Sequence, residues 1–430
     1  MTLLVFLLLA AYYLIKTARE VLILTEGGAE VKSYSSAGQA VLLLFLVPAY
    51  AAFASRASPV RLVTSVTLFF ASNLVMFVLA IGAGLRVGVV FFLWVGIFNL
   101  MVIAQFWAFA ADLYSEEQGR RLFPLIGVGA SLGAWLGAVR AGTLIDTGSP
   151  ARLLTGACAT LIICAALVPV ASRLTRRTEP DARAAVVAPA VRRGGFTLVR
   201  GDRYLLLLAA LTFLLNVVNT SGEYLFGRYI VEQAQTLVPG SDGAAQAARE
   251  RFVGETYSRF FGVVNLVGFL LQAFAVSRLF AWLGVGRSLF IHPLIALGGY
   301  MLMLRSPSLG LIAAVKVADN SVNYSIGNTA RQALWLPTSR EAKYQAKQAI
   351  DSFFVRMGDV LSALLVFAGT SVWVLQPRGF AAINALLVLI WLGLAWRVGR
   401  YYKQLAETGQ PPTSEVVTAG ARPAASPSRA

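Results

Sequence analysis

The chain has 430 residues, of which 57% are hydrophobic and 13% are charged, whereas a soluble domain carries about 25% charged residues. Its net charge of +16 comes from arginines scattered between apolar stretches, not from a basic helix with interleaved aromatic side chains. Composition therefore excludes a soluble globular domain and argues against a nucleic-acid partner. The sequence predicts an all-α polytopic membrane protein whose surroundings are the lipid bilayer.

Twelve apolar stretches follow one another along the chain, each near the roughly 20 residues that cross the hydrocarbon core of a bilayer. A polar connection with eight arginines, 173–203, separates them six from six. We expect an N-terminal six-helix bundle (1–172), a cytoplasmic linker (173–203), a C-terminal six-helix bundle (204–400) and a disordered tail (401–430). Two six-helix halves are typical of the major facilitator arrangement. The predicted spans are 2–24, 36–54, 62–82, 87–111, 122–140, 151–172, 204–230, 257–280, 288–304, 308–328, 347–374 and 379–397.

The distribution of positive charge predicts how the chain is oriented. The loops after even-numbered spans, together with the tail, hold most of the Lys and Arg residues. Because loops rich in these residues stay in the cytoplasm, we expect both termini to be cytoplasmic, in the inner (plasma) membrane of a bacterium. The outer segment 231–256 mixes acidic and basic residues and is expected to be a solvated loop.

Ionisable side chains interrupt several spans, although a charge at bilayer depth costs from roughly 2.5 to more than 10 kcal/mol. In span 1, Lys16, Arg19 and Glu20 share one helical face through their i, i+3, i+4 spacing. We expect the candidate residues to line a shared cavity in which Lys and Arg bind the negative groups of a solute. The further candidates, in spans 7, 10 and 11, are Asn219, Glu223, Lys316, Asp319, Lys347, Asp351 and Arg356.

For each of these charges the alternative is a structural ion pair or a helix-end side chain that reaches the membrane interface. That alternative is favoured for Lys32, Arg228 and Lys347. A functional role is favoured for the span 1 cluster and for Glu223, because several ionisable neighbours occur together.

Other patterns argue against enzymatic or cofactor chemistry. The stretch "GVGASLGAWLGA" lacks the Lys-Ser/Thr ending of a phosphate-binding loop, and its Gly129, Gly133 and Gly137 instead predict close helix packing. The sequence has one histidine, His292, and shows no zinc or nucleophile motif. No enzyme activity, metal or cofactor is expected, and the cysteines of span 6 are expected to pack in the core.

Three stretches resemble the non-mitochondrial ATP/ADP translocases, the nucleotide transporters of plastids and intracellular bacteria, and their bacterial relatives. They are "YYLIKTAREVLILTEGGAEV", "FWAFAADLYSEEQGRRLFPLIGVGAS" and "KYQAKQAIDSFFVRMGD". The resemblance implies a twelve-helix nucleotide carrier that works by alternating access without ATP hydrolysis. It also implies that Arg19 and Lys347 stand at the family's functional basic positions.

The chain departs from that family pattern at three places. Apolar residues near Val95 stand where the family has a glutamate in span 4, and the span 7 glutamate falls on Asn219, with Glu223 one turn further on. Asp359 stands where a lysine is expected. These departures leave the expected fold intact and put strict ATP/ADP exchange in question.

The sequence therefore predicts a monomeric carrier for a small anionic solute that is phosphorylated or nucleotide-like, such as ATP or ADP. Transport by exchange and transport by proton coupling both remain open. Lys16, Arg19 and Lys347 are expected to contact negative groups, with Glu20, Glu223 and Asp351 as their partners or as proton carriers. The alternatives are a proton-coupled facilitator for another organic solute and a membrane sensor of the same fold that transports nothing.

Overall fold

A computed structural model describes residues 1–54, 59–114, 116–146, 148–176, 194–305, 308–339 and 341–408. Apart from short turns, these residues are helical. In the first half the helices are α1 (Thr2–Glu26), α2 (Gly28–Ala54), α3 (Pro59–Gly82), α4 (Gly88–Phe98), the π-helical η1 (Asn99–Ile103), α5 (Ala104–Leu113), α6 (Glu116–Asp146) and α7 (Pro150–Arg176).

The second half opens with a short helix and continues with long ones that π-helical turns interrupt. Its elements are α8 (Gly195–Gly201), α9 (Arg203–Leu237), α10 (Gly243–Leu270), η2 (Leu271–Ala275), α11 (Val276–Ser288), α12 (Ile291–Arg305), α13 (Leu309–Val322), η3 (Asn323–Gly327), α14 (Asn328–Ala333), η4 (Ala342–Ala346), α15 (Lys347–Ala349), η5 (Ile350–Phe354), α16 (Val355–Phe367), η6 (Ala368–Val372) and α17 (Pro377–Thr408).

The prediction of an all-α polytopic membrane fold is confirmed. Each of the twelve predicted spans falls on a helix or on a run of helices, and nine helices in the described residues are long and apolar enough to cross a membrane. Helices suit the bilayer because each helix pairs its own backbone N–H and C=O groups, and the hydrocarbon core offers no other hydrogen-bond partners.

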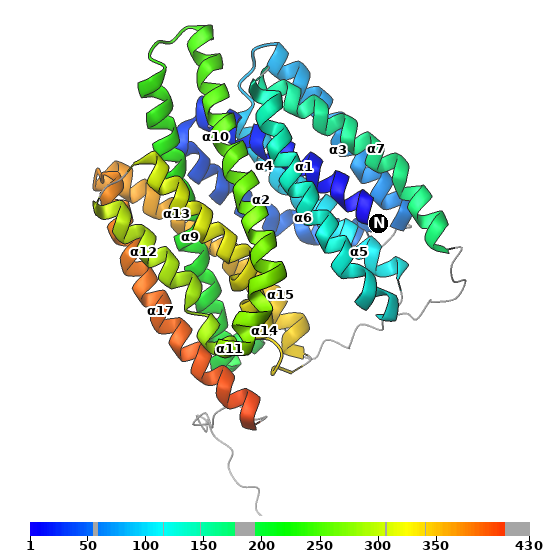
Figure 1. Cartoon of the computed structure of the whole chain (residues 1–430), viewed down its shortest axis with the longest axis vertical. Coiled ribbons are helices and arrows are strands. Elements are labelled where there is room, and N and C mark those ends of the chain that lie inside the picture. Colours follow the sequence, from blue (N-terminus) through cyan, green and yellow to red (C-terminus); the bar gives the residue numbers. More distant parts are fainter. Residues whose placement is uncertain are drawn as a thin grey trace, which may run out of the picture.

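Two large hydrophobic cores and one small cluster of Val276, Val322 and Ile326 hold the helices together. One large core is built from residues of the first six spans, and the other consists mainly of residues from α8 onward. In Figure 1 helices α3 and α7 lie on one side of the molecule and α12, α13 and α17 on the other. The predicted linker lies between these two sets in the sequence, and its residues 177–193 are outside the described part of the chain.

The glycine repeat of span 5 packs closely against another helix, as predicted, and that helix is α1. An added Cβ at Gly129, Gly133 or Gly137 would meet backbone atoms of Thr2, Phe6 and Ala10, respectively, on α1. Small residues at every fourth position therefore let the two backbones approach closely. This contact fixes the face of α1 that points away from α6.

The predicted start of the second span is wrong by eight residues, and the error affects the site. Helix α2 begins at Gly28, directly after α1, because Gly28 adopts a φ of 78° that other residues rarely accept. The polar stretch from Gly28 to Ser35 has no apolar signal, yet it is helical. Lys32 consequently lies within a helix and not in a loop.

Two other segments expected to be irregular are also helical in part. The connection between α9 and α10 covers only 238–242, because the polar residues on either side extend the helices and Asp242 caps α10 by accepting a hydrogen bond from Ala245 N. Helix α17 continues to Thr408, whereas the tail was predicted to begin at 401. The remaining tail, 409–430, is outside the described residues.

Candidate functional site

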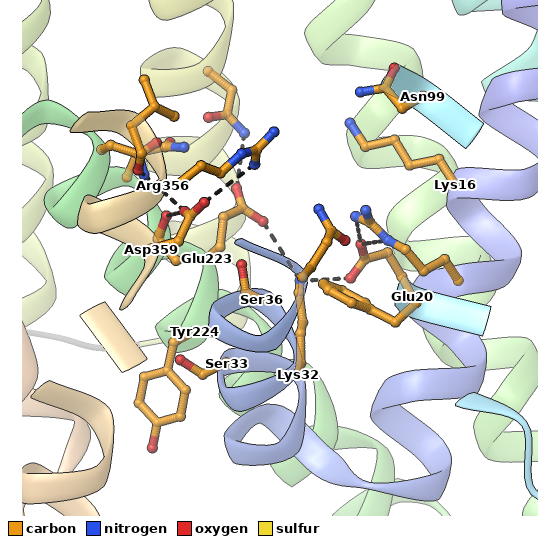
Figure 2. A pocket seen from close by; sticks show the side chains of 18 of the residues that line it. Lys16, Glu20, Lys32, Ser33, Ser36, Asn99, Glu223, Tyr224, Arg356 and Asp359 are labelled. Carbon is orange, nitrogen blue, oxygen red and sulfur yellow. Dashed lines mark hydrogen bonds and ion pairs between the residues drawn. The ribbon is translucent and has the colours of Figure 1, made fainter. Parts of the chain in front are cut away.

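A central cavity of about 450 Å³ lies between the two halves, within the size range of small-molecule sites. Residues of α1, α2, α4, η1, α9, α10, α13, η3 and α16 line it. Figure 2 shows that Lys16 and Arg356 extend toward it from opposite sides. The two halves of the chain therefore contribute opposite walls of one site.

The α1 wall carries two cations and one carboxylate. The Lys16 ammonium lies 4.2 Å from the ring centroid of Phe261, and no ion pair joins it to a carboxylate in the described residues. The Arg19 guanidinium lies 4.7 Å from the ring centroid of Phe92 and is paired with Glu20. These cation–π contacts stabilise both side chains modestly, and an aromatic ring does not cancel the positive charge of either one.

Helix α2 supplies a polar face that was not predicted. Lys32, Ser33, Ser36 and Gln39 all line the cavity, as their i, i+1, i+4, i+7 spacing on one helix allows. Two interpretations were favoured for Lys32, a structural ion pair and an interface charge; the structure shows ion pairs, so only the interface charge is wrong. The Lys32 side chain is only 10% exposed within the protein, because α2 begins early enough to bring it between the halves.

Lys32 connects the two halves electrostatically. Its ammonium lies 2.6 Å from the Glu20 carboxylate on α1 and 3.8 Å from the Glu223 carboxylate on α9. It also donates a hydrogen bond of 3.3 Å to Tyr257 Oη on α10. Figure 2 shows the Lys32 side chain between Glu20 and Glu223.

Behind Glu223 the charge network continues into the second half. Lys316 Nζ lies 3.4 Å from Glu223 Oε1 and 3.1 Å from Asp319 Oδ2, and His292 Nε2 lies 2.9 Å from Asp319 Oδ1. The fractional exposure of Lys316 is 1%. Lys316 and Asp319 therefore support the cavity wall from behind without lining it.

The opposite wall is formed by α16 and α9. Arg356 Nη1 lies 3.5 Å from Asp359 Oδ2, while Asp359 Oδ1 accepts hydrogen bonds from Asn216 Nδ2 at 2.8 Å and Thr220 Oγ1 at 2.9 Å. Neutral donors therefore satisfy one oxygen of Asp359, and its ion pair with Arg356 is long. Asn219 also lines this wall.

The structure brings together most of the residues proposed from the sequence. Arg19 and Glu223, from opposite halves, line the same cavity. Lys347 and Asp351 do not line it and form a partly exposed i,i+4 pair at 3.3 Å. The predicted residues that line the cavity are Lys16, Arg19, Glu20, Asn219, Glu223 and Arg356.

Sequence reasoning missed several polar residues of the cavity. Asn99 lies in the π-helical turn η1 of span 4, close to the apolar stretch where no polar group was recognised. The spacing of Lys32, Ser33, Ser36 and Gln39 was a detectable signal, hidden because hydropathy excluded that segment from a span. Among the described residues no cluster of His, Cys, Asp or Glu could hold a metal ion.

No family model matches the chain. The curated protein named ADP,ATP carrier protein 1 of Chlamydia muridarum (strain MoPn / Nigg) is 23% identical to this chain; the alignment covers 76% of this chain and 67% of the relative. The protein of the same name in Chlamydia pneumoniae is 22% identical, and the alignment covers 71% of this chain and 65% of the relative. The chain spans about two thirds of the length of these relatives.

Solved transporter structures share the fold at low sequence identity. A bacterial homologue of the iron transporter ferroportin, inward-facing, has a TM-score of 0.61 and 14% identity, with 93% of this chain and 98% of that chain covered. The nucleoside transporter NupG has a TM-score of 0.57 and 12% identity, with 94% of this chain and 98% of that chain covered. An inward-facing bacterial homologue of the lysosomal transporter Spinster has a TM-score of 0.55 and 16% identity, with 93% of this chain and 97% of that chain covered.

Fold and cavity together define an integral membrane protein with the architecture of a major-facilitator transporter. The resemblance to the nucleotide-translocase family and its major-facilitator-like relatives, first seen in three sequence stretches, is confirmed. The similar proteins are carriers and transporters, in agreement with the prediction that the chain is not an enzyme.

Proposed function

We propose that this protein carries an anionic, phosphorylated or nucleotide-like solute across a bacterial inner membrane by alternating access. Exchange of one solute for another, as in an ATP:ADP antiporter, is the proposed mode, with a single chain as the transporting unit and both termini in the cytoplasm. Lys16, Arg19 and Arg356 bind the negative groups. Lys347 and Asp351 are proposed to act outside the central cavity, where the solute approaches it.

One observation carries the proposal: Lys16 presents a cationic group to the cavity without an acidic partner among the described residues. A buried or half-buried charge without a counter-ion is costly, and an anionic solute would supply that counter-ion. The names of the curated relatives, ADP,ATP carrier proteins, suggest the chemical class of the solute.

The contacts between the halves support an alternating-access cycle. At the end where α1 turns into α2, Tyr224 Oη donates a hydrogen bond of 3.4 Å to Glu30, and a Cβ added at Gly227 would lie 3.2 Å from Leu24. With both termini in the cytoplasm, this packed end faces outward. The described conformation is then closed to the outside.

Replacing Arg19 with glutamine should abolish exchange while the protein stays folded, because Glu20 keeps Lys32 as an ion-pair partner. The measurement is uptake of labelled ATP, ADP or AMP into proteoliposomes preloaded with the unlabelled nucleotide. Arg259→Gln on α10 is the matched control, since the Arg259 side chain is 82% exposed and does not line the cavity. Unchanged uptake by the Arg19 variant would remove Arg19 from the site.

A second candidate, a proton-coupled carrier of another organic anion, is favoured by the three carboxylates of the cavity. An imposed pH gradient separates the two functions. Exchange should proceed without a gradient, whereas a proton-coupled carrier accumulates solute only when protons flow inward. A chain that moves no solute under either condition would be a sensor that shares the fold.

A further inference from the structure

The balance of charge in the cavity restricts its substrate. Four cationic and three anionic side chains line the cavity, so the lining has a formal net charge of +1. The Lys316 and Asp319 pair behind the wall adds no net charge. The lining residues are Lys16, Arg19, Lys32 and Arg356 against Glu20, Glu223 and Asp359.

Most of the cations already have carboxylate partners. Arg19 is paired with Glu20, and Lys32 lies between Glu20 and Glu223. Lys16 has no ion-pair partner among the described residues. Arg356 is 3.5 Å from Asp359, and its side chain is 30% exposed. Two positive groups, Lys16 and Arg356, can therefore turn to a ligand without leaving a carboxylate unsatisfied, because Asn216 and Thr220 also serve Asp359.

Two available cations on opposite walls match one phosphate monoester, which carries a charge of about −1.5 to −2 at neutral pH. Every additional phosphate group brings more negative charge, for which the lining offers no further free cation. In a site with low effective dielectric such excess charge is strongly unfavourable.

The rest of the lining is uncharged and mostly polar, with the apolar side chains of Phe92, Phe261 and Val355 beside it. It includes five carboxamides, those of Gln39, Asn99, Asn216, Asn219 and Asn320. Carboxamides both donate and accept hydrogen bonds, so this lining suits a ligand body with O–H and N–H groups.

On the basis of the proposed function, we infer that the preferred substrate is a phosphate monoester whose body has O–H and N–H groups, such as a nucleoside monophosphate, and not a nucleoside di- or triphosphate. Lys16 and Arg356 bind the phosphate from opposite walls. The carboxamides and hydroxyls of α2, η1 and α9 bind the neutral part.

Equilibrium binding of adenosine, AMP, ADP and ATP to the purified full chain at fixed ionic strength tests the inference, with and without Mg²⁺. AMP should bind about tenfold or more tightly than ATP, and more tightly than adenosine, since charge decides the order. ATP binding as tight as AMP binding would overturn the inference and leave the proposed function standing. Binding of none of the phosphorylated compounds would overturn both.

Two substitutions test the charge balance within the protein. Asp359→Asn raises the formal net charge of the lining to +2 and should improve ADP binding relative to AMP binding several-fold. Arg356→Gln lowers that net charge and should weaken AMP binding. Glu255→Gln, outside the cavity and paired with Arg259, should leave the AMP to ADP ratio unchanged. A ratio that Asp359→Asn does not shift in a folded variant would contradict the inference.

Discussion

Lys16→Gln should lower the affinity for the phosphorylated solute about 10- to 100-fold, since hydrogen bonds to charged groups contribute about 1.5–3 kcal/mol. The thermal unfolding midpoint should stay near that of the unchanged protein. The reason is that Lys16 contacts aromatic rings and forms no ion pair with a carboxylate among the described residues, so its removal leaves no buried acid unpaired.

Equilibrium binding and uptake in the same preparation check this expectation. Lys403→Gln is the matched control, because its side chain is 75% exposed on α17 and far along the chain from the cavity residues. Equal affinity in the Lys16 variant and the control would show that Lys16 does not contact the solute. A large fall in unfolding midpoint would instead indicate a structural role.

Lys32→Met should destabilise the protein, but by less than the about 3–5 kcal/mol that follows when a buried charge loses its only partner. The substitution leaves Glu20 with Arg19 alone and Glu223 with Lys316 alone. It also removes the side chain that joins α2 to α9 and α10. The halves should therefore separate more readily at the end that is packed in this conformation.

A second variant distinguishes charge from packing. Combining Lys32→Met with Glu223→Gln removes the carboxylate that the first change leaves underneutralised, so the loss of stability should be smaller than the sum of the two single effects. The measurement is a double-mutant cycle on the unfolding midpoint of detergent-solubilised protein. Additive losses would mean that Lys32 and Glu223 do not interact, despite their proximity.

Hydropathy predicted the fold well because a membrane imposes one rule on every span. A helix must present about 20 apolar residues to the hydrocarbon, and the approximate positions of the spans follow from that alone. Helix ends were predicted less well where polar residues continue a helix, as at Gly28–Ser35, 231–237 and 401–408. Such segments carry no apolar signal, although they are stabilised by ordinary backbone hydrogen bonds.

The sequence pointed to cavity-lining residues where a charge lies within an apolar span. Lys16, Arg19, Glu20 and Glu223 are conspicuous for that reason. The position of Lys32 in the cavity lining was missed because its neighbours in the sequence are polar, so hydropathy placed the segment outside a span. Only the left-handed turn at Gly28, which reverses the chain at once, brings Lys32 against Glu20 and Glu223.

The separation of Lys316 and Asp319 from the cavity surface could not be predicted from spacing. Both lie on the same helix as Asn320, which lines the cavity, and a single helix turn decides which side chains face the solute. The packing of α12 behind α13 covers the other two, where His292 also reaches Asp319. That choice of face depends on neighbours from distant parts of the chain.

Solute protection of an introduced thiol tests most directly whether the solute occupies the central cavity. Ser36→Cys, in a chain with Cys158 and Cys164 changed to alanine, places one reactive group in the lining, and Thr143→Cys on the exposed face of α6 is the control. Saturating AMP should slow alkylation at position 36 about tenfold and leave position 143 unaffected, as binding equilibria predict for an occupied site. Equal alkylation rates at position 36 with and without bound solute would contradict the account.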